Sequence, residues 1–162
     1  MSAATAISGD SVARISRDQR QKISATTAPA LLNRATAAGV ELPICAAVAD
    51  LLARYPGCTT AKVKVAERGQ TLRDDIARVD AVRAHVPNVR VDANGGWTVD
   101  EAERALAALG DLEYAEQPCA SVDELVEVRR RLPQVRIAAD ESIRRADDPM
   151  RVVRAGGLDV AV

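Results

Sequence analysis

The chain has 162 residues, with 22 Lys or Arg, 23 Asp or Glu and a formal net charge of −1. This length allows one domain with a substantial core, and the balanced charge gives no sign of a nucleic-acid-binding surface. The three cysteines form no Cys-x-x-Cys pair, which argues against a disulfide framework. The sequence shows neither a secretory signal nor a membrane span. We therefore expect a cytoplasmic protein that binds neither nucleic acid nor membranes.

The N-terminal part, residues 1–58, contains no recognisable chemistry. Residues 1–28 are rich in Ser, Ala, Thr and charge, and we expect a loose or partly disordered leader. Two short helices are predicted over 29–39 and 43–54. The second is stopped by the turn sequence Tyr55-Pro56-Gly57.

From residue 59 onward, short apolar runs alternate with helical patterns. Strands are expected near 61–65, 89–93, 112–116, 135–139 and 158–162. Helices are expected over 71–86, 98–109 and 121–132, and from Asp148-Pro149, as N-cap and first residue, to Gly156. This alternation indicates a parallel sheet in the α/β class. We predict a partial (β/α) barrel of the TIM type over 59–162, with about five βα units, whereas a closed barrel needs about 250 residues.

Three carboxylates recur at the C-terminal ends of successive predicted strands. Asp92, Glu116 and Asp140 are spaced 24 residues apart, and Lys64 precedes Asp92 by 28 residues. A single carboxylate at such a position is usually a solvated acid at the start of a loop. Three carboxylates at equal spacing, each at the end of a strand, would meet at one end of a barrel and repel each other unless a cation bound between them. Oxygen ligands favour Mg²⁺, so we predict a divalent metal site.

Strand alternation places a second set of charges on the same inner face. Lys62 and Lys64 share a face, as do Arg90, Asp92 and Asn94. Arg90 is best interpreted as a structural charge partner. Two lysines beside three acids indicate catalysis instead, because burial near a cation lowers the pKa of a lysine and makes it a usable base.

Four motifs in this order carry a family resemblance over about residues 50–162. They are Lys62-Val63-Lys64, Val91-Asp92-Ala93-Asn94-Gly95, Ala115-Glu116-Gln117-Pro118 and Ala139-Asp140-Glu141-Ser142. Together they resemble the muconate-lactonising subgroup of the enolase superfamily. The resemblance implies that Asp92, Glu116 and Asp140 bind Mg²⁺. It also implies that Lys64 is the general base and that Lys62 supports it electrostatically. Asn94 is implied to be substrate-binding or to contact the residues that bind the substrate or the metal.

The resemblance also implies a reaction. The dehydrating lyase of menaquinone biosynthesis in this subgroup abstracts a proton α to the carboxylate of a small-molecule substrate, and the metal stabilises the enediolate. The alternatives are a dipeptide epimerase, an N-acylamino-acid racemase, a cycloisomerase, or a non-catalytic truncated remnant.

The family pattern includes parts that this sequence does not match. Residues 1–58 are too short for the family's capping domain, and the family's second catalytic lysine would fall on a strand that begins near Leu158, past the end of the sequence. We therefore expect a truncated barrel with very little activity on its own, able to self-associate through open sheet edges.

Overall fold

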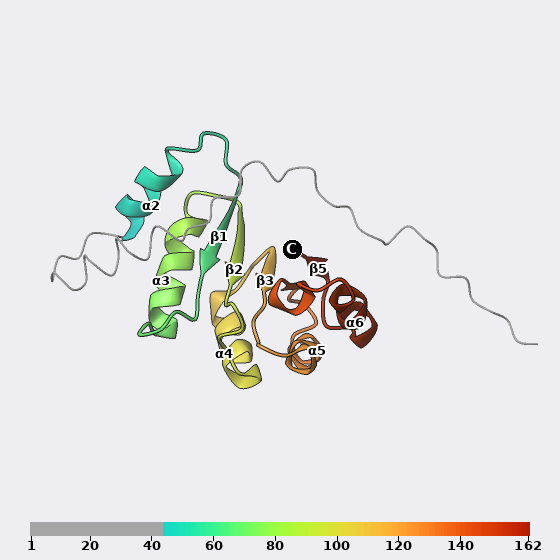
Figure 1. Ribbon diagram of the computed structural model, residues 1–162. Coiled ribbons are helices and arrows are strands. Elements are labelled where there is room, and N and C mark those ends of the chain that lie inside the picture. Colours follow the sequence, from blue (N-terminus) through green and yellow to red (C-terminus); the bar gives the residue numbers. More distant parts are fainter. Residues whose placement is uncertain (1–43) are drawn as a thin grey trace, which may run out of the picture.

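The structure is a computed structural model that describes residues 44–162 (Figure 1). The leader expected over 1–28 and the helix expected over 29–39 lie outside the described residues. The described elements are α2 (Ile44–Leu52), β1 (Thr60–Lys64), α3 (Leu72–Arg83), β2 (Asn88–Asp92), α4 (Val99–Leu109), β3 (Tyr114–Glu116), α5 (Val122–Arg131), β4 (Ile137–Ala139), η2 (Glu141–Ile143), α6 (Asp148–Ala155) and β5 (Val160–Ala161).

The five strands form one sheet in the order β1-β2-β3-β4-β5, and every pair is parallel. Each strand therefore lies beside its neighbour in sequence, and helices α3 to α6 follow one another around the outside of the sheet (Figure 1). The order never reverses, so each βα unit adds to the sheet in the same direction, as in a (β/α) barrel and unlike a doubly wound sheet. The predicted α/β class and partial barrel are confirmed.

Several element boundaries differ from those expected. Three strands are shorter, since β3 begins at Tyr114, β4 begins at Ile137 and β5 is limited to Val160–Ala161. The predicted N-cap Asp148 is wrong: Asp147 is the N-cap of α6. The chain already turns before the helix, because Asp148 N–H donates to Arg145 O (3.1 Å) while the Asp148 carboxylate accepts from Arg145 N–H (3.1 Å). Asp148 thus becomes the first helical residue.

The outer face of the sheet is apolar and packs against the helices. Val63 and Val91 are buried to 1% and 0% exposure, and they join Leu106 and Leu125 in a single core. Helix α2 packs against α3, and its Val48 belongs to the same core. The described part of the N-terminal segment is thereby attached to the barrel.

Two helices begin as the sequence predicts. Thr98 Oγ1 accepts from Glu101 N–H (3.3 Å), and the Glu101 carboxylate accepts from Thr98 N–H (2.9 Å). Ser121 and Glu124 repeat this reciprocal capping box at the start of α5. Each box satisfies backbone donors that the first helical turn leaves unpaired, so the capping residues fix where the outer helices start relative to the strand ends.

The inner face of the sheet is arranged in rows set by the parallel register. One row joins Lys62, Arg90 and Tyr114. Arg90 donates to both oxygens of Glu113 (2.7 and 3.1 Å) and lies over the Tyr114 ring, 4.8 Å from its centroid. Arg90 is thus a structural charge partner, as the sequence indicates. The row above it begins with Lys64 and continues through Asp92 and Glu116.

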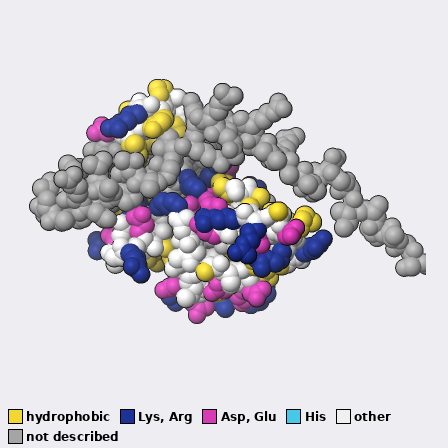
Figure 2. Space-filling model, viewed as in Figure 1, with side chains coloured by type: hydrophobic (Ala, Val, Ile, Leu, Met, Phe, Trp, Pro, Cys, Tyr) yellow, Lys and Arg dark blue, Asp and Glu magenta, His cyan; other side chains and the backbone are white. Residues whose placement is uncertain are grey.

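Charges of both signs are interspersed on the visible surface of the described part, without a large field of one sign (Figure 2). Helices of the length and hydropathy needed to cross a bilayer do not occur among residues 44–162.

Candidate active site

The two lysines and two of the predicted carboxylates meet at the C-terminal ends of β1, β2 and β3. Lys62 Nζ lies 2.7 Å from Glu116 Oε1 and 3.2 Å from Asp92 Oδ2. Lys64 Nζ lies 2.6 Å from the same Asp92 oxygen and 2.5 Å from Asn94 Oδ1. All five of these side chains are predicted site residues, and the register of three adjacent strands brings them together.

Burial makes these charges interact strongly. The Asp92 and Glu116 side chains are 1% and 0% exposed. Burial alone would raise the pKa of Asp92, but the hydrogen bond from Lys64 and the charge of Lys62 outweigh it and lower the pKa. Burial and the nearby charge of Asp92 raise the pKa of Glu116 despite its hydrogen bond with Lys62. The site therefore holds one firmly ionised carboxylate beside one that protonates more readily.

The pKa of Lys62 differs from the sequence-based expectation of a lowered value. Burial acts to lower it, but the hydrogen bond to Glu116 and the charges of Glu116 and Asp92 outweigh burial and raise the pKa. The lysine faces two buried carboxylates at close range, which reverses the expected direction.

The structure does not bring Asp140 level with the other two carboxylates. Glu116 is paired with Ala138, and Asp140 follows two residues later, beyond the end of β4. Two residues of strand correspond to roughly 6.5 Å. The Asp140 side chain is 35% exposed, and its Oδ1 lies 3.9 Å from Arg144 Nε. Among the described residues, no group of three His, Cys, Asp or Glu side chains is arranged to hold one metal ion. Equal spacing in sequence did not translate into equal height in the sheet.

The donor chemistry of the cluster nevertheless fits a hard divalent cation. Glu116 Oε2 is buried and has no hydrogen-bond partner among the described residues. A buried carboxylate oxygen without a partner is costly, and a cation would satisfy it. Asp92 and Glu116 present only oxygen donors, so these two residues would hold the ion, and the Asp140 carboxylate would have to approach to complete the set.

The loops above the site share an uncommon backbone conformation. Ala66, Asn94 and Gln117 all have positive φ, at 60°, 48° and 39°. These residues lie one or two positions after the ends of β1, β2 and β3. Non-glycine residues seldom adopt this region unless the surroundings hold them there. The chain therefore turns sharply as each site residue leaves its strand.

Gln117 is a site residue that the sequence analysis missed. Its buried carboxamide oxygen accepts from the backbone N–H of Asp140 (3.1 Å) and of Ser142 (3.2 Å), and its Nε2 donates to Cys119 O (2.9 Å) and Ser142 Oγ (2.7 Å). It thus ties the loop after β3 to the loop after β4. The sequence shows a polar residue directly after the predicted ligand Glu116, but it does not reveal these partners.

Glu141 belongs to one of the four motifs, and the structure gives it contacts that the sequence does not predict. Its Oε1 accepts from Asn94 Nδ2 (3.0 Å) and from Arg144 (3.1 Å), while Oε2 is buried without a partner among the described residues. Asn94 therefore connects Lys64 to Glu141 and is part of the polar network around the two lysines.

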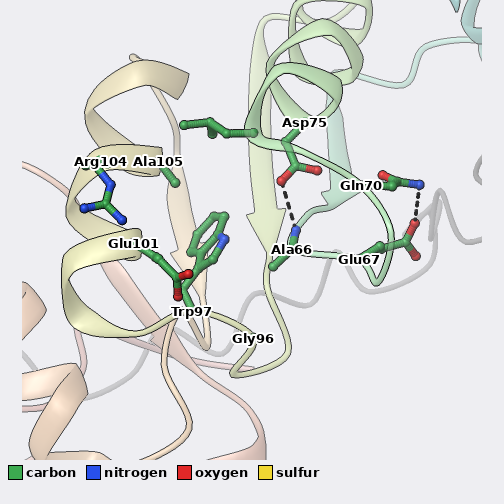
Figure 3. Close-up of a pocket in the computed structure, with 10 residues that line it drawn as sticks. Ala66, Glu67, Gln70, Asp75, Gly96, Trp97, Glu101, Arg104 and Ala105 are labelled. Carbon is green, nitrogen blue, oxygen red and sulfur yellow. Dashed lines mark hydrogen bonds between the residues drawn. The ribbon is translucent and has the colours of Figure 1, made fainter.

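A pocket of about 350 Å³ lies between the loops that follow β1 and β2, at the starts of α3 and α4 (Figure 3). Ala66, Asp75, Trp97, Glu101 and Arg104 are among its lining residues. Gly96 forms part of the wall, where an added Cβ would lie 2.9 Å from Ala93 O and 3.0 Å from Ala66 Cβ. The two loops can approach this closely only because residue 96 has no side chain.

Comparison with known proteins agrees with this geometry. Residues 45–162 match the family described as enolase C-terminal domain-like. The o-succinylbenzoate synthase of Mycobacterium ulcerans is 67% identical over 120 residues, which cover 72% of this chain and 36% of that protein. The o-succinylbenzoate synthase of Mycolicibacterium smegmatis is 59% identical over 140 residues, or 83% and 43% of the two chains. The matched part of the chain thus spans less than half the length of these relatives.

Solved structures show the same likeness. A dipeptide epimerase from Enterococcus faecalis V583 superposes with a TM-score of 0.65 at 32% identity, over 73% of this chain and 36% of that one. A racemase from Streptomyces coelicolor A3(2), with bound magnesium, gives a TM-score of 0.62 at 33% identity, over 75% and 38% of the two chains. The chain belongs to the enolase C-terminal domain-like family, within the enolase superfamily.

Proposed function

We propose that this chain provides the metal-binding and proton-transferring part of an o-succinylbenzoate synthase, a carbon–oxygen lyase of menaquinone biosynthesis. The observation that carries the proposal is the 67% identity to the synthase of Mycobacterium ulcerans. This identity is about twice that to the epimerase and the racemase. The substrate would be a small carboxylate.

The proposed roles follow from the contacts of the cluster. Lys64 Nζ is fixed by Asp92 and Asn94 at the open end of the strands, where it can take a proton from a carbon α to the substrate carboxylate. Lys62 lies one row deeper and adds positive charge near the same point. General base catalysis of this kind typically contributes about 10²–10⁴-fold to a rate.

Asp92, Glu116 and Asp140 are proposed to hold a divalent ion, Mg²⁺. When bound, this ion supplies the positive charge that opposes the charge developing on the substrate carboxylate. Two observations support the ion: Glu116 Oε2 lacks a partner among the described residues, and the similar racemase has bound magnesium.

A second candidate is a dipeptide epimerase or racemase. The observation that favours it is the superposition with two such enzymes at 32% and 33% identity. Both candidates use the same proton abstraction and differ in the next step, because a lyase expels a hydroxyl group whereas an epimerase returns the proton.

The test replaces the matched segment of the Mycobacterium ulcerans synthase with residues 45–162 of this chain. We expect the chimera to dehydrate the cyclohexadiene substrate with Mg²⁺, and the same chimera with Lys64→Ala to lose at least about 10²-fold in kcat. A folded chimera without activity would refute the proposed roles. The unaltered 162-residue chain is assayed in parallel for dehydration and for dipeptide epimerisation, and turnover of dipeptides alone would favour the second candidate.

A further inference from the structure

Helix α3 places two opposite charges in the layer between helices and sheet, where the packing is otherwise apolar. Asp75 is 3% exposed and Arg78 is 4% exposed. The two side chains are one helical turn apart and form an ion pair. Burial raises the pKa of Asp75 even though Arg78 and the backbone of Ala66 act to lower it. A buried ion pair is expensive to desolvate and often contributes little net stability, so stability alone is a weak reason for its presence.

Both side chains bind the segment that follows β1. Arg78 Nη2 donates to the backbone carbonyl of Lys64 (3.1 Å), and Arg78 Nη1 donates to Gln70 Oε1. Asp75 Oδ2 accepts from the backbone N–H of Ala66 (3.0 Å), as the dashed line in Figure 3 shows. One helix therefore binds the chain at three points, from the carbonyl of the proposed catalytic Lys64 to the side chain of Gln70.

These contacts supply what the sheet does not. Val65 N–H donates to Asp92 O on β2 (3.0 Å). Because backbone groups alternate along a strand, the Lys64 carbonyl faces away from β2, and Arg78 is its partner. Ala66 has a φ of 60°, a conformation that a non-glycine residue holds only when its surroundings require it. The hydrogen bond to Asp75 meets that requirement.

We propose that Asp75 and Arg78 are positioning residues that hold the end of β1 so that Lys64 and Lys62 point at Asp92 and Glu116. The catalytic meaning of this role rests on the proposed function, whereas the positioning itself does not. A misplacement of about 1 Å at a reacting group can cost about 10²-fold in rate. The opposing interpretation is that the ion pair only stabilises the fold.

The composition of the chain allows a direct measurement. The sequence contains only three lysines, and the described residues contain only Lys62 and Lys64. Cleavage after Arg54 and Arg68 releases both on one peptide, on which fragment masses separate them. Brief acetylation of the full chain with acetic anhydride, compared with the urea-unfolded chain, gives a protection factor for each lysine.

The test compares Arg78→Met with two controls. Arg73→Met removes an exposed arginine from the same helix, and Val152→Ala destabilises the core at α6, at the far end of the sheet from β1. Arg78→Lys keeps the charge but loses the fork that reaches several acceptors at once. All variants are labelled under conditions where urea titration shows the unfolded fraction to be negligible.

We expect Arg78→Met to lower the protection of Lys64 about tenfold, the size expected when one charge-assisted hydrogen bond is lost. Arg78→Lys should give an intermediate loss, and both controls should stay within about twofold of the parent. Unchanged protection in Arg78→Met, or an equal loss in Val152→Ala, would overturn the positioning role. Turnover is not the readout, so a folded chimera without activity, beside a chain in which Arg78→Met still shows the tenfold loss, would refute the proposed reaction alone.

Discussion

Replacing Lys62 by methionine should make the stability of the chain depend on divalent ions. The Lys62 ammonium is within hydrogen-bonding distance of Asp92 and Glu116, whose side chains are 1% and 0% exposed, while Lys62 itself is 25% exposed. Methionine fills a similar volume but leaves two buried carboxylates with one counter-ion, Lys64, which of the two carboxylates contacts Asp92 alone. The change therefore isolates the electrostatic contribution.

The magnitude follows from burial. Removing one partner of a buried ion pair costs about 3–5 kcal/mol, and the partial exposure of Lys62 reduces this to roughly 3 kcal/mol, about a 100-fold rise in the unfolded-to-folded ratio. Mg²⁺ should recover much of the loss, because an ion at 100 times its dissociation constant adds about 2.7 kcal/mol.

The pH dependence has a defined sign. The raised pKa of Lys62 means that its contribution is fully present below the ordinary lysine value of 10.5 and is lost as pH rises through the higher folded-state pKa. The difference between parent and Lys62→Met should therefore vanish above that pKa. It should also shrink on acidification, because Glu116, whose pKa is already raised, can then be protonated in the variant.

Urea unfolding followed by circular dichroism, at pH 5 and 7.5 with EDTA or 10 mM MgCl₂, measures the loss of stability, its decrease on acidification and its recovery with Mg²⁺. Arg73→Met is the control for loss of an exposed cation. A Lys62→Met chain within about 0.5 kcal/mol of the parent at pH 7.5 in EDTA would refute the electrostatic reasoning. A full loss that Mg²⁺ does not reduce would refute the cation site.

Three further predictions concern single residues. Glu116→Gln should abolish the shift of the melting temperature with Mg²⁺ in differential scanning fluorimetry, because it removes one proposed ligand charge and leaves the shape unchanged. Ile137→Ala should lower the free energy of unfolding by about 2–5 kcal/mol in urea titration, since Ile137 is fully buried. Asp159→Asn should flatten the loss of stability on acidification. Burial opposes the ionised form of Asp159, but hydrogen bonds from Arg129 and from the Ile137 backbone outweigh it and lower the pKa. The stability that ionised Asp159 contributes is present above the ordinary pKa of 3.8 and is lost as pH falls through the lower folded-state pKa. If the stability of Asp159→Asn fell on acidification as steeply as that of the parent, this prediction would be contradicted.

The order of strands could be predicted because each strand has a local sequence pattern. Val63 and Val91 alternate with charged neighbours, and this period assigns one face to the helices and the other to the site. The capping boxes at Thr98 and Ser121 fixed the starts of two helices within a residue. The start of α6 was misplaced by one residue because Asp147 and Asp148 are both plausible caps, and only the preceding turn distinguishes them.

The buried pair on α3 could have been anticipated in part. Asp75 and Arg78 lie on the face that also carries Val79 and Val82, so opposite charges three residues apart interrupt an apolar stripe. Such a pattern indicates a buried ion pair. It does not indicate that the partners include the carbonyl of Lys64, because a backbone contact between a helix and the preceding strand depends on how the connecting segment closes.

The position of Asp140 illustrates what spacing cannot determine. Asp92, Glu116 and Asp140 are separated by equal numbers of residues, yet Asp92 pairs with Glu116 whereas Glu116 pairs with Ala138. The spacing in sequence counts the residues of strand, loop and helix together. The position of a residue along the sheet depends instead on where the strand after each helix begins and on its register against the neighbouring strand. In the register of β3 against β4, Asp140 lies two residues beyond the position opposite Glu116. The Gln117 side chain accepts a hydrogen bond from the Asp140 backbone N–H and holds it there. With the backbone held in this way, the partly exposed Asp140 side chain would have to turn to join Asp92 and Glu116 in holding an ion. Completing the proposed metal site would therefore depend on the rotamer of Asp140, because the Gln117 side chain already holds the Asp140 backbone.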